Sequence, residues 1–178
     1  MPDVIDPATA PSNVTVYRGV DDLSAAVGVE LGPTDWLTMT QDRIDAFADA
    51  TEDHQWIHVD PSRASESPYG ATIAHGFLTL SLVPHFMSSL RRFDRVRMGL
   101  NYGLDKVRFP AAVPSGARLR GRMRLDGVEP LPSNGVQLTT TITIEVEGNA
   151  KPACVATLVS RYSFHDTAEG DDRSQSDD

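Results

Sequence analysis

Alternation of apolar and polar residues predicts three β-strands in the second half of the chain. In residues 117–125 every second residue is small or apolar, and the residues between them are Arg118, Arg120, Arg122 and Arg124. The alternation resumes over residues 136–147, and residues 153–164 are rich in Val, Ala, Leu and Tyr. This pattern indicates strands with one buried face, and the short breaks favour antiparallel neighbours. A fourth strand is expected around Val107–Phe109, with one or two short strands before residue 40.

Helical periodicity appears in the first half. Residues 41–51 place apolar side chains on one helical face, and either Thr38 or Thr40 suits the N-cap. Asp60 and Pro61 can start a short helix that extends to residue 66. The segment from residue 76 to residue 90 is apolar on most faces, which predicts a buried helix with a kink or an early end at Pro84.

These elements predict an α+β fold in which an antiparallel sheet is covered by one long apolar helix. Residues 13–165 are expected to form a single domain. Residues 1–12 contain three prolines, and residues 166–178 contain six acidic residues against one arginine. Both ends lack hydrophobic periodicity, so we expect a disordered N-terminal arm and a disordered acidic tail.

Composition narrows the functional classes. The chain has 178 residues with 25 acidic and 16 basic side chains, and this net acidity argues against a general nucleic-acid binder. Cys154 is the only cysteine, which excludes an intramolecular disulfide framework and a zinc site built on cysteines. No apolar run is long enough for a membrane span, and the N-terminus lacks the features of a secretion signal. A cytoplasmic protein without a membrane partner is expected.

The charge is distributed unevenly along the chain. Residues 13–66 contain eleven acidic and three basic side chains, whereas residues 67–165 contain six acidic and twelve basic ones. Ten of those bases fall within residues 91–124. Two interpretations remain open at this point: solvated faces that neutralise each other on folding, or a basic surface for a polyanionic ligand.

Titratable side chains are densest over residues 52–60, Glu-Asp-His-Gln-Trp-Ile-His-Val-Asp. A solvated loop is one interpretation. A metal site could draw on Asp53, His54, His58 or Asp60, but the His-Glu-x-x-His signature is absent. A nucleophilic triad is disfavoured, because no Gly-x-Ser-x-Gly elbow occurs and Cys154 lies in a strand pattern. The fourth interpretation is an Asp–His pair for general acid–base chemistry on a water molecule.

The last interpretation agrees with a family resemblance. Residues 53–61, Asp-His-Gln-Trp-Ile-His-Val-Asp-Pro, with Ala64 downstream, resemble the hydratase-2 motif of MaoC-like and R-specific enoyl-CoA hydratases. Residues 73–77 resemble the start of the helix that closes the same active site, and residues 106–113 with Gly116 resemble a strand that enters the sheet. Gln55-Trp56 replaces the usual Asn-Pro, and Glu52 stands where glycine is frequent. The likeness covers residues 30–163.

The resemblance implies the hot-dog fold, in which a curled antiparallel sheet wraps a long central helix. It implies hydration of a trans-2-enoyl-CoA to an (R)-3-hydroxyacyl-CoA, or the reverse dehydration. Asp53 and His58 would hold the water. The backbone N–H of Gly76 would stabilise the charge on the thioester oxygen, a role that also suits the free N–H groups at a helix start.

The same resemblance suggests where the rest of the substrate lies. Tyr69, Phe77 and Leu78 are candidates for the apolar wall. Lys106, Arg108 and members of the Arg91–Arg97 cluster are candidates for the phosphates of coenzyme A. No metal and no cofactor are expected beyond coenzyme A as part of the substrate, and an acyl-carrier-protein thioester is an alternative carrier. A homodimer with sheets joined edge to edge is expected.

Two rival functions remain. A hot-dog acyl-CoA thioesterase would use Asp53 or Glu52 to activate water at the carbonyl carbon. A non-catalytic acyl-thioester-binding protein could be built on the same scaffold.

Overall fold

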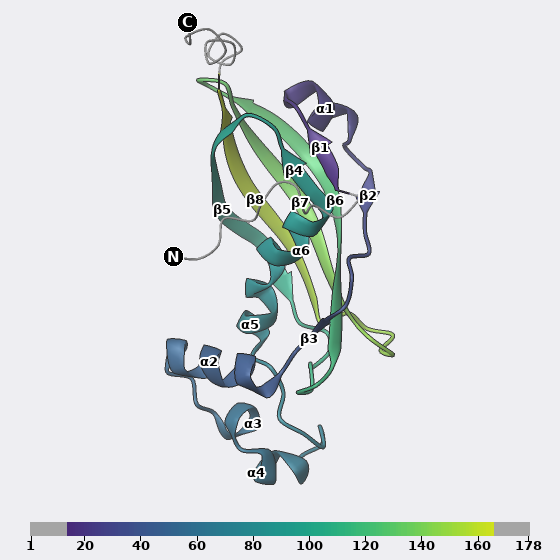
Figure 1. Ribbon diagram of the computed structural model, residues 1–178, viewed down its shortest axis with the longest axis vertical. Helices are drawn as coiled ribbons and strands as arrows, with labels where there is room; N and C mark the ends of the chain where they lie inside the picture. The colour runs from purple at the N-terminus through teal and green to yellow at the C-terminus, as the bar shows by residue number, and fades with distance from the viewer. Residues whose placement is uncertain (1–13, 166–178) are drawn as a thin grey trace, which may run out of the picture.

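The computed structural model describes residues 14–165 and shows an α+β arrangement (Figure 1). The arm expected at residues 1–12 and the tail expected at residues 166–178 lie outside the described residues. In chain order the elements are β1 (Thr15–Tyr17), α1 (Val20–Ala25), β2 (Glu30–Leu31), β3 (Leu37–Thr38), α2 (Gln41–Thr51), α3 (Trp56–Val59), α4 (Pro61–Ser65), α5 (Gly76–Ser81), α6 (Val83–Leu90), β4 (Arg91–Phe93), β5 (Val96–Arg108), β6 (Arg118–Leu131), β7 (Gly135–Val146) and β8 (Cys154–Phe164).

The main sheet is antiparallel and has six strands. Its order is β2-β6-β7-β8-β5, and β3 also pairs with β6. The three strands expected from alternation are β6, β7 and β8, and they are neighbours as the short connections predict. Leu119, Met123 and Leu125 of β6 are at most 2% exposed, so the alternation in the sequence marks the buried face correctly. A second, two-stranded parallel sheet joins β1 to β4.

The apolar segment at residues 76–90 covers one face of the sheet, but it forms two short helices rather than the expected long one. α5 ends at Ser81 and α6 begins at Val83. Pro84 stands in the first turn of α6, where its missing N–H leaves no helical hydrogen bond unmade, so the expected interruption is confirmed. Figure 1 shows the helices lying against the sheet, which is not tightly curled around them. No helix among residues 14–165 is long and apolar enough to cross a membrane.

Contact between α6 and β6 forms the centre of the core. Phe86 is 1% exposed, and a Cβ atom on Gly121 would lie 2.6 Å from the Cβ atom of Phe86. Only glycine at this position of β6 therefore leaves room for the ring. Buried residues of β7 and β8, including Ile142, Ile144 and Leu158, complete this cluster.

The edge strand β5 is much longer than expected. The sequence predicted a strand around Val107–Phe109, whereas the structure has thirteen residues in β5, ending at Arg108. Most of β5 is exposed, so burial imposes no alternation on its sequence. Its Gly99 lies under the ring of Tyr162, where a Cβ atom would meet the ring at 2.7 Å. The elements α1, α3 and β4 were also not expected.

The helices α2, α3 and α4 lie beyond one end of the sheet (Figure 1). The expected helix at residues 41–51 is confirmed as α2, and the side chain of Thr40 accepts a hydrogen bond from the Arg43 N–H at 3.3 Å. Asp60 caps α4 in the same way, accepting from the Arg63 N–H at 3.0 Å. These caps fix where the intervening segment, residues 52–60, leaves one helix and enters the next.

We expect the Phe86→Ala variant to lose about 3–5 kcal/mol of unfolding free energy, because it removes a fully buried ring from the contact with β6. The matched control is Phe77→Ala, which removes a ring that is 72% exposed and should cost less than about 1 kcal/mol. Urea unfolding followed by circular dichroism measures both. Equal losses in the two variants would contradict this account of the core.

Candidate active site

Asp53 lies just after α2, where the chain turns sharply. The turn is made by Glu52, whose φ of 61° places it in the left-handed region that favours glycine. This explains in physical terms why glycine suits this position. The turn leaves the Asp53 side chain 56% exposed beside two buried histidines.

His58 is buried within the single helical turn α3. Its Nδ1 atom lies 2.6 Å from the carbonyl oxygen of Ile73. A carbonyl oxygen only accepts, so Nδ1–H is the donor and a neutral ring carries its lone pair on Nε2. The N–H of Ile73 donates in turn to the carbonyl oxygen of Ile57 at 3.0 Å. These two bonds fix the imidazole relative to the chain that leads into α5.

His75 is a third member of the site that the sequence reasoning did not assign. It is 3% exposed, and its Nε2 atom donates to the backbone carbonyl oxygen of Asp53 at 2.9 Å. Its ring stacks on the ring of His58 with a centroid separation of 3.7 Å. Its position immediately before Gly76 was the available signal, but sequence spacing does not show that a histidine before a helix turns inward.

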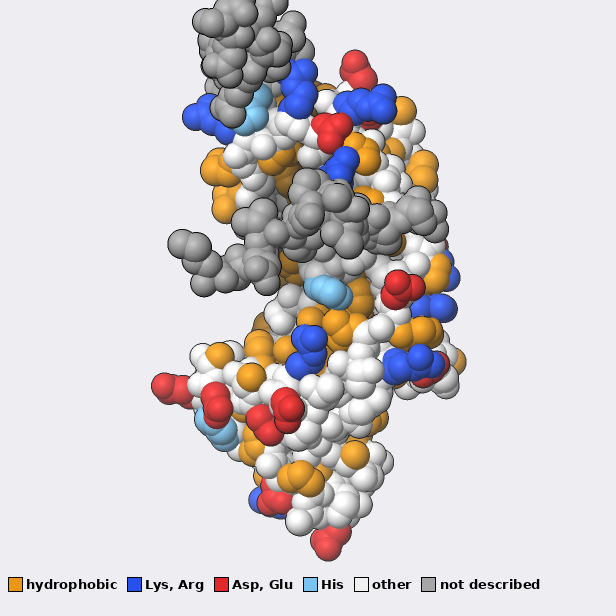
Figure 2. Space-filling model, in the orientation of Figure 1, with side chains coloured by type: hydrophobic (Ala, Val, Ile, Leu, Met, Phe, Trp, Pro, Cys, Tyr) orange, Lys and Arg blue, Asp and Glu red, His pale blue; other side chains and the backbone are white. Residues whose placement is uncertain are grey.

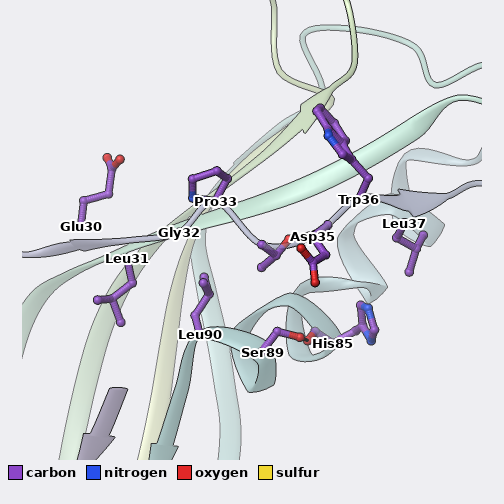
Figure 3. A pocket seen from close by; sticks show the side chains of 11 residues that line it. Glu30, Leu31, Gly32, Pro33, Asp35, Trp36, Leu37, His85, Ser89 and Leu90 are labelled. Carbon is purple, nitrogen blue, oxygen red and sulfur yellow. Dashed lines mark hydrogen bonds between the residues drawn. The ribbon is translucent and has the colours of Figure 1, made fainter. Parts of the chain in front are cut away.

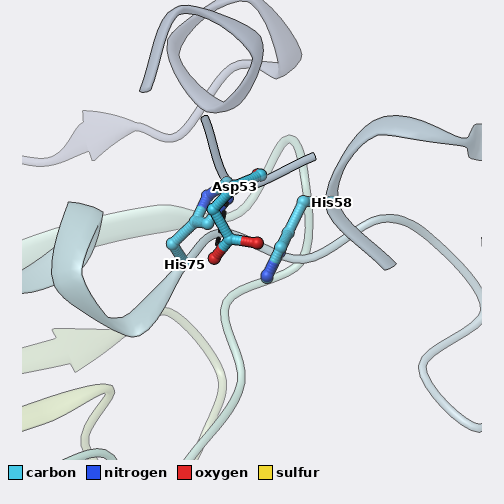
Figure 4. A group of neighbouring side chains, drawn as sticks. All are labelled: Asp53, His58 and His75. Atoms are coloured by element: carbon cyan, nitrogen blue, oxygen red, sulfur yellow. Dashed lines mark hydrogen bonds and ion pairs between the residues drawn. The ribbon is translucent and has the colours of Figure 1, made fainter. Parts of the chain in front are cut away.

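The three side chains converge in space. One ligand-type atom each from Asp53, His58 and His75 lies within 4.8 Å of the others. Figure 4 shows the Asp53 carboxylate projecting into the space beside the two rings. This spacing is too wide for a direct hydrogen bond between all three but suits a small polar molecule held between the carboxylate and His58.

Gln41, at the start of α2, positions the segment from the other side. Its amide nitrogen donates to the carbonyl oxygen of His58 at 2.8 Å, and its amide oxygen accepts from the hydroxyl of Thr72 at 2.5 Å. One side chain thus links α2 to α3 and to the segment before α5. The sequence contained no local signal for Gln41, because its partners are 17 and 31 residues away.

Burial sets the protonation of His58. It lowers the pKa of His58 below the ordinary value of 6.5, and the nearby His75 acts in the same direction. The hydrogen bond to Ile73 and the charge of Asp53 oppose this shift in pKa without reversing it. His58 is therefore a neutral imidazole at pH 7, able to accept a proton at Nε2.

Gly76 begins α5 directly after His75. As the first residue of the helix, its N–H has no acceptor within the helix. A Cβ atom on Gly76 would lie 2.9 Å from the ring of Phe109, so this backbone is closely approached from the β5 side. The rings of Phe77 and Phe109 meet edge to face at 6.1 Å. The structure thus brings Gly76 and Phe77 next to the Asp–His cluster.

The other predicted site residues are placed less directly. Tyr69 is 50% exposed, and no described contact ties it to the cluster. Lys106 and Arg108 lie on exposed β5, and Arg108 immediately precedes the Phe109 that contacts Gly76. Arg91 is only 4% exposed, so it is wrong as a candidate for phosphates that stay in solvent.

The basic stretch is largely neutralised by folding. Ion pairs join Arg118 to Glu147, Arg120 and Arg122 to Glu145, Arg122 to Glu30, and Arg124 to Asp126. The first of the two interpretations therefore holds for β6. Lys106 and Arg108 make no ion pair with a carboxylate of residues 14–165, which leaves their charges available. In Figure 2 acidic side chains gather over the α2–α4 end, while most basic ones in view lie over the sheet.

The chemistry of the donor set disfavours a metal or a thiol nucleophile. The rings of His58 and His75 are only 24° from parallel, so their in-plane lone pairs do not converge on one ion. His75 also uses Nε2 to hold Asp53. Burial raises the pKa of the Cys154 thiol to about 11, so this thiol is protonated and unreactive at neutral pH.

A cavity of about 580 Å³ lies elsewhere, between residues 30–37 and α6 (Figure 3). Its lining includes Asp35, Trp36 and His85, but none of the three clustered residues and not Gly76. The convergent polar groups, of which the two histidines are buried, mark the candidate active site outside this cavity.

Comparison with known proteins identifies the family of this chain. Residues 22–147 match the family model described as the MaoC like domain. The chain is 53% identical over 146 residues to 3-hydroxyacyl-thioester dehydratase Z of Mycobacterium tuberculosis, covering 82% of this chain and 97% of that protein. It is 46% identical over 145 residues to Nodulation protein N of Rhizobium leguminosarum, covering 80% and 90%. The solved (R)-hydratase from A. caviae superposes with a TM-score of 0.60 at 20% identity, covering 78% and 96%.

We expect the His58 imidazole to titrate below 6.5, because burial favours its neutral form, and His54 to titrate above 6.5, because its bond to exposed Asp49 favours the charged form. NMR titration of the ring signals measures both. Protonation of His58 opposes the fold, so its contribution to stability falls as the pH drops below the unfolded-state value of 6.5. A His58 midpoint at or above that of His54 would contradict the burial argument.

Proposed function

The chain belongs to the MaoC-like domain family, and from this premise we propose that it is a 3-hydroxyacyl-thioester dehydratase, a hydro-lyase. It interconverts a 3-hydroxyacyl thioester and the trans-2-enoyl thioester plus water, with (R) configuration at carbon 3. The observation that carries this proposal is the convergence of Asp53 and neutral, buried His58 beside the helix start at Gly76. The relative from Mycobacterium tuberculosis is named for the same reaction.

Asp53 and His58 bind the water and transfer a proton. In dehydration the C2–H bond and the C3–O bond break, and the hydroxyl leaves as water after it takes up a proton. In hydration water adds to carbon 3 and a proton is delivered to carbon 2. His58 Nε2 accepts or returns one proton, and the Asp53 carboxylate holds the water or hydroxyl by hydrogen bonding. His75 is a positioning residue, because it holds the Asp53 backbone and packs on the His58 ring.

The backbone of Gly76 stabilises the enolate. Proton removal at carbon 2 places negative charge on the thioester oxygen. An N–H group without a helical acceptor, at the positive end of a helix dipole, meets that charge. The close approach of Phe109 leaves little room for a side chain here, which favours glycine. Phe77 and Tyr69 form apolar contacts with the first part of the acyl chain.

The carrier is coenzyme A or an acyl-carrier protein. Lys106 and Arg108, which have no described carboxylate partner, contact phosphate groups of the carrier. No metal or separate cofactor takes part, since the thioester itself supplies the electron sink. These residues lie on β5, at the edge of the sheet.

That edge also supports a homodimer in the hot-dog arrangement. β5 ends the sheet, is thirteen residues long, and exposes Met98, Leu100 and Tyr102 at alternate positions. A long edge strand with exposed apolar side chains is prone to pair with another strand. Pairing of β5 with its copy across a two-fold axis joins the two sheets and places basic residues of one subunit near the substrate of the other.

The thioesterase and the binding protein remain as rivals. A thioesterase with the same pair would attack carbon 1 and release a free thiol. The dehydratase is favoured over the thioesterase because the relative at 53% identity is named as a 3-hydroxyacyl-thioester dehydratase.

We expect Asp53→Asn and His58→Ala each to lower kcat/KM by about 100- to 10,000-fold, since each removes a group that manages the proton or the water. The assay follows the enoyl absorbance of crotonyl-CoA and, in parallel, free thiol. Loss of absorbance without thiol release supports hydration.

The matched control is His54→Ala, which removes an exposed histidine paired with Asp49, one residue from Asp53, and should leave the rate unchanged. Addition of EDTA should also have no effect. Thiol release by the wild-type protein would favour the thioesterase, and turnover that survives both substitutions would refute the proposed roles.

We expect a wild-type mass of twice 19.4 kDa by light scattering, and a shift to the monomer in the double variant Met98→Glu, Leu100→Glu. Like charges opposite each other across paired strands destabilise the pairing. The control is Val27→Glu, Val29→Glu, which alters two other exposed apolar residues. A monomeric wild type, or dimers in all variants, would refute the β5 interface.

A further inference from the structure

An apolar groove runs between the helices α5–α6 and the edge strand β5. A cavity of about 450 Å³ there is lined mainly by apolar side chains, among them Leu80 and Val83 of the helices, Leu104 of β5 and Leu158 of β8. Figure 1 shows α5 and α6 standing beside β5 along this stretch. The volume falls in the range of ordinary ligand pockets.

The groove begins about one helical turn beyond Gly76. Leu80 lies four residues after Gly76 and so on the same side of the helix. A second cavity of about 220 Å³ adjoins the first, since both are lined by Pro84 and Asn101. From Gly76 to Arg91 the path follows α5 and α6 for a distance of about 20 Å. An acyl chain that starts at Gly76 can therefore follow the groove to the second cavity.

The far end of the groove contains a buried cation without a partner. Arg91 lines the second cavity and is 4% exposed. Its Nη1 and Nη2 atoms make no hydrogen bond within residues 14–165. Its guanidinium carbon lies 4.9 Å from the centre of the Phe93 ring and 5.9 Å from that of Tyr162. The rings pack beside the guanidinium group, and the Tyr162 side chain favours its charged form, but no carboxylate of residues 14–165 forms an ion pair with it.

A second polar side chain lines this end of the groove. Asn101 lines the cavity with Arg91, and its cross-strand partner is Ser160 of β8. The Ser160 hydroxyl is fully buried and has no hydrogen-bond partner among the described residues. Arg91 and Asn101 thus lie together at the end of an otherwise apolar groove.

A buried guanidinium group with unpaired N–H groups is unfavourable unless an anion accepts hydrogen bonds from it. Burial lowers the pKa of Arg91 from its ordinary value, and the nearby Tyr162 and Tyr17 oppose this shift. Arginine nevertheless keeps its charge in proteins. A carboxylate matches the planar fork of the two Nη atoms and accepts two parallel hydrogen bonds.

We propose that Arg91 at the far end of this groove binds a carboxylate on the distal end of the acyl chain, so that the substrates of this protein are ω-carboxyacyl thioesters. This inference rests on the proposed dehydratase function and specifies its substrate class. The apolar part of the groove holds the methylene chain, and Asn101 contributes a polar contact to the terminal group.

The test compares pairs of enoyl-CoA substrates of equal length, one ending in a methyl group and one in a carboxylate, from about four to about sixteen carbons. For chains long enough to reach Arg91 we expect the wild-type kcat/KM to favour the carboxylate by about 10- to 100-fold, the usual range for a charge-assisted bond. Short chains should show no such preference. The preference should appear mainly in KM.

Arg91→Met should abolish the preference for the carboxylate while retaining a side chain of similar length. The matched control is Arg92→Met, which removes the neighbouring, half-exposed arginine and should leave the preference intact. Should Arg91→Met fail to fold, Leu104→Trp serves instead, because it fills the groove and should lower the ratio of long-chain to short-chain rates.

The outcomes separate the two proposals. Crotonyl-CoA turnover without any preference for the carboxylate overturns this inference and leaves the dehydratase function standing. Inactivity on every thioester overturns the proposed function itself. A preference that appears only after residues 166–178 are deleted would also overturn the inference, since the acidic tail would then be the natural partner of Arg91.

Discussion

The site depends on two imidazoles that are buried and kept in place by main-chain carbonyl groups. His58 donates to Ile73 and His75 donates to Asp53, and the two rings stack on each other. Each bond satisfies one ring nitrogen of a buried imidazole, which lowers the free-energy cost of its burial. They also tie together the segment after α2, the turn α3 and the start of α5.

The sheet fixes this arrangement in space. The Ala74 N–H donates to Val113 at 2.8 Å, and Ile73 forms an isolated β-bridge with Pro114. The histidine-bearing segment is thereby attached to the chain that enters β6. On the other side, Phe109 at the end of β5 packs on Gly76. His58 and Gly76 are held by different neighbours of one sheet, which keeps their spacing constant.

Much of the fold could be predicted from the sequence, because elements with one buried face have apolar residues at regular spacing. β6, β7 and β8 have one buried face and alternate accordingly, and α2 shows its amphipathic face and its Thr40 cap. The edge strand β5 is exposed and was mostly missed. For the site, the local motif contained Asp53 and His58, but His75 and Gln41 act through partners 17 to 31 residues away. Such contacts leave no periodic signal.

The arginines also show that the sequence pattern does not reveal which charges are paired in the structure. The arginines of β6 occur at every second position in the sequence, and each forms an ion pair with a carboxylate on β2, on β6 or in the β7 region. A surface charge that is paired in this way requires no ligand. Arg91 has no distinguishing position in the sequence, where it belongs to the Arg91–Arg97 cluster of candidates for phosphate binding. Its burial without an acceptor is visible only after folding. The free energy needed to keep an unpaired cation inside the fold is large, so it is the solitary buried arginine, rather than the row of exposed ones, that points to an anionic ligand.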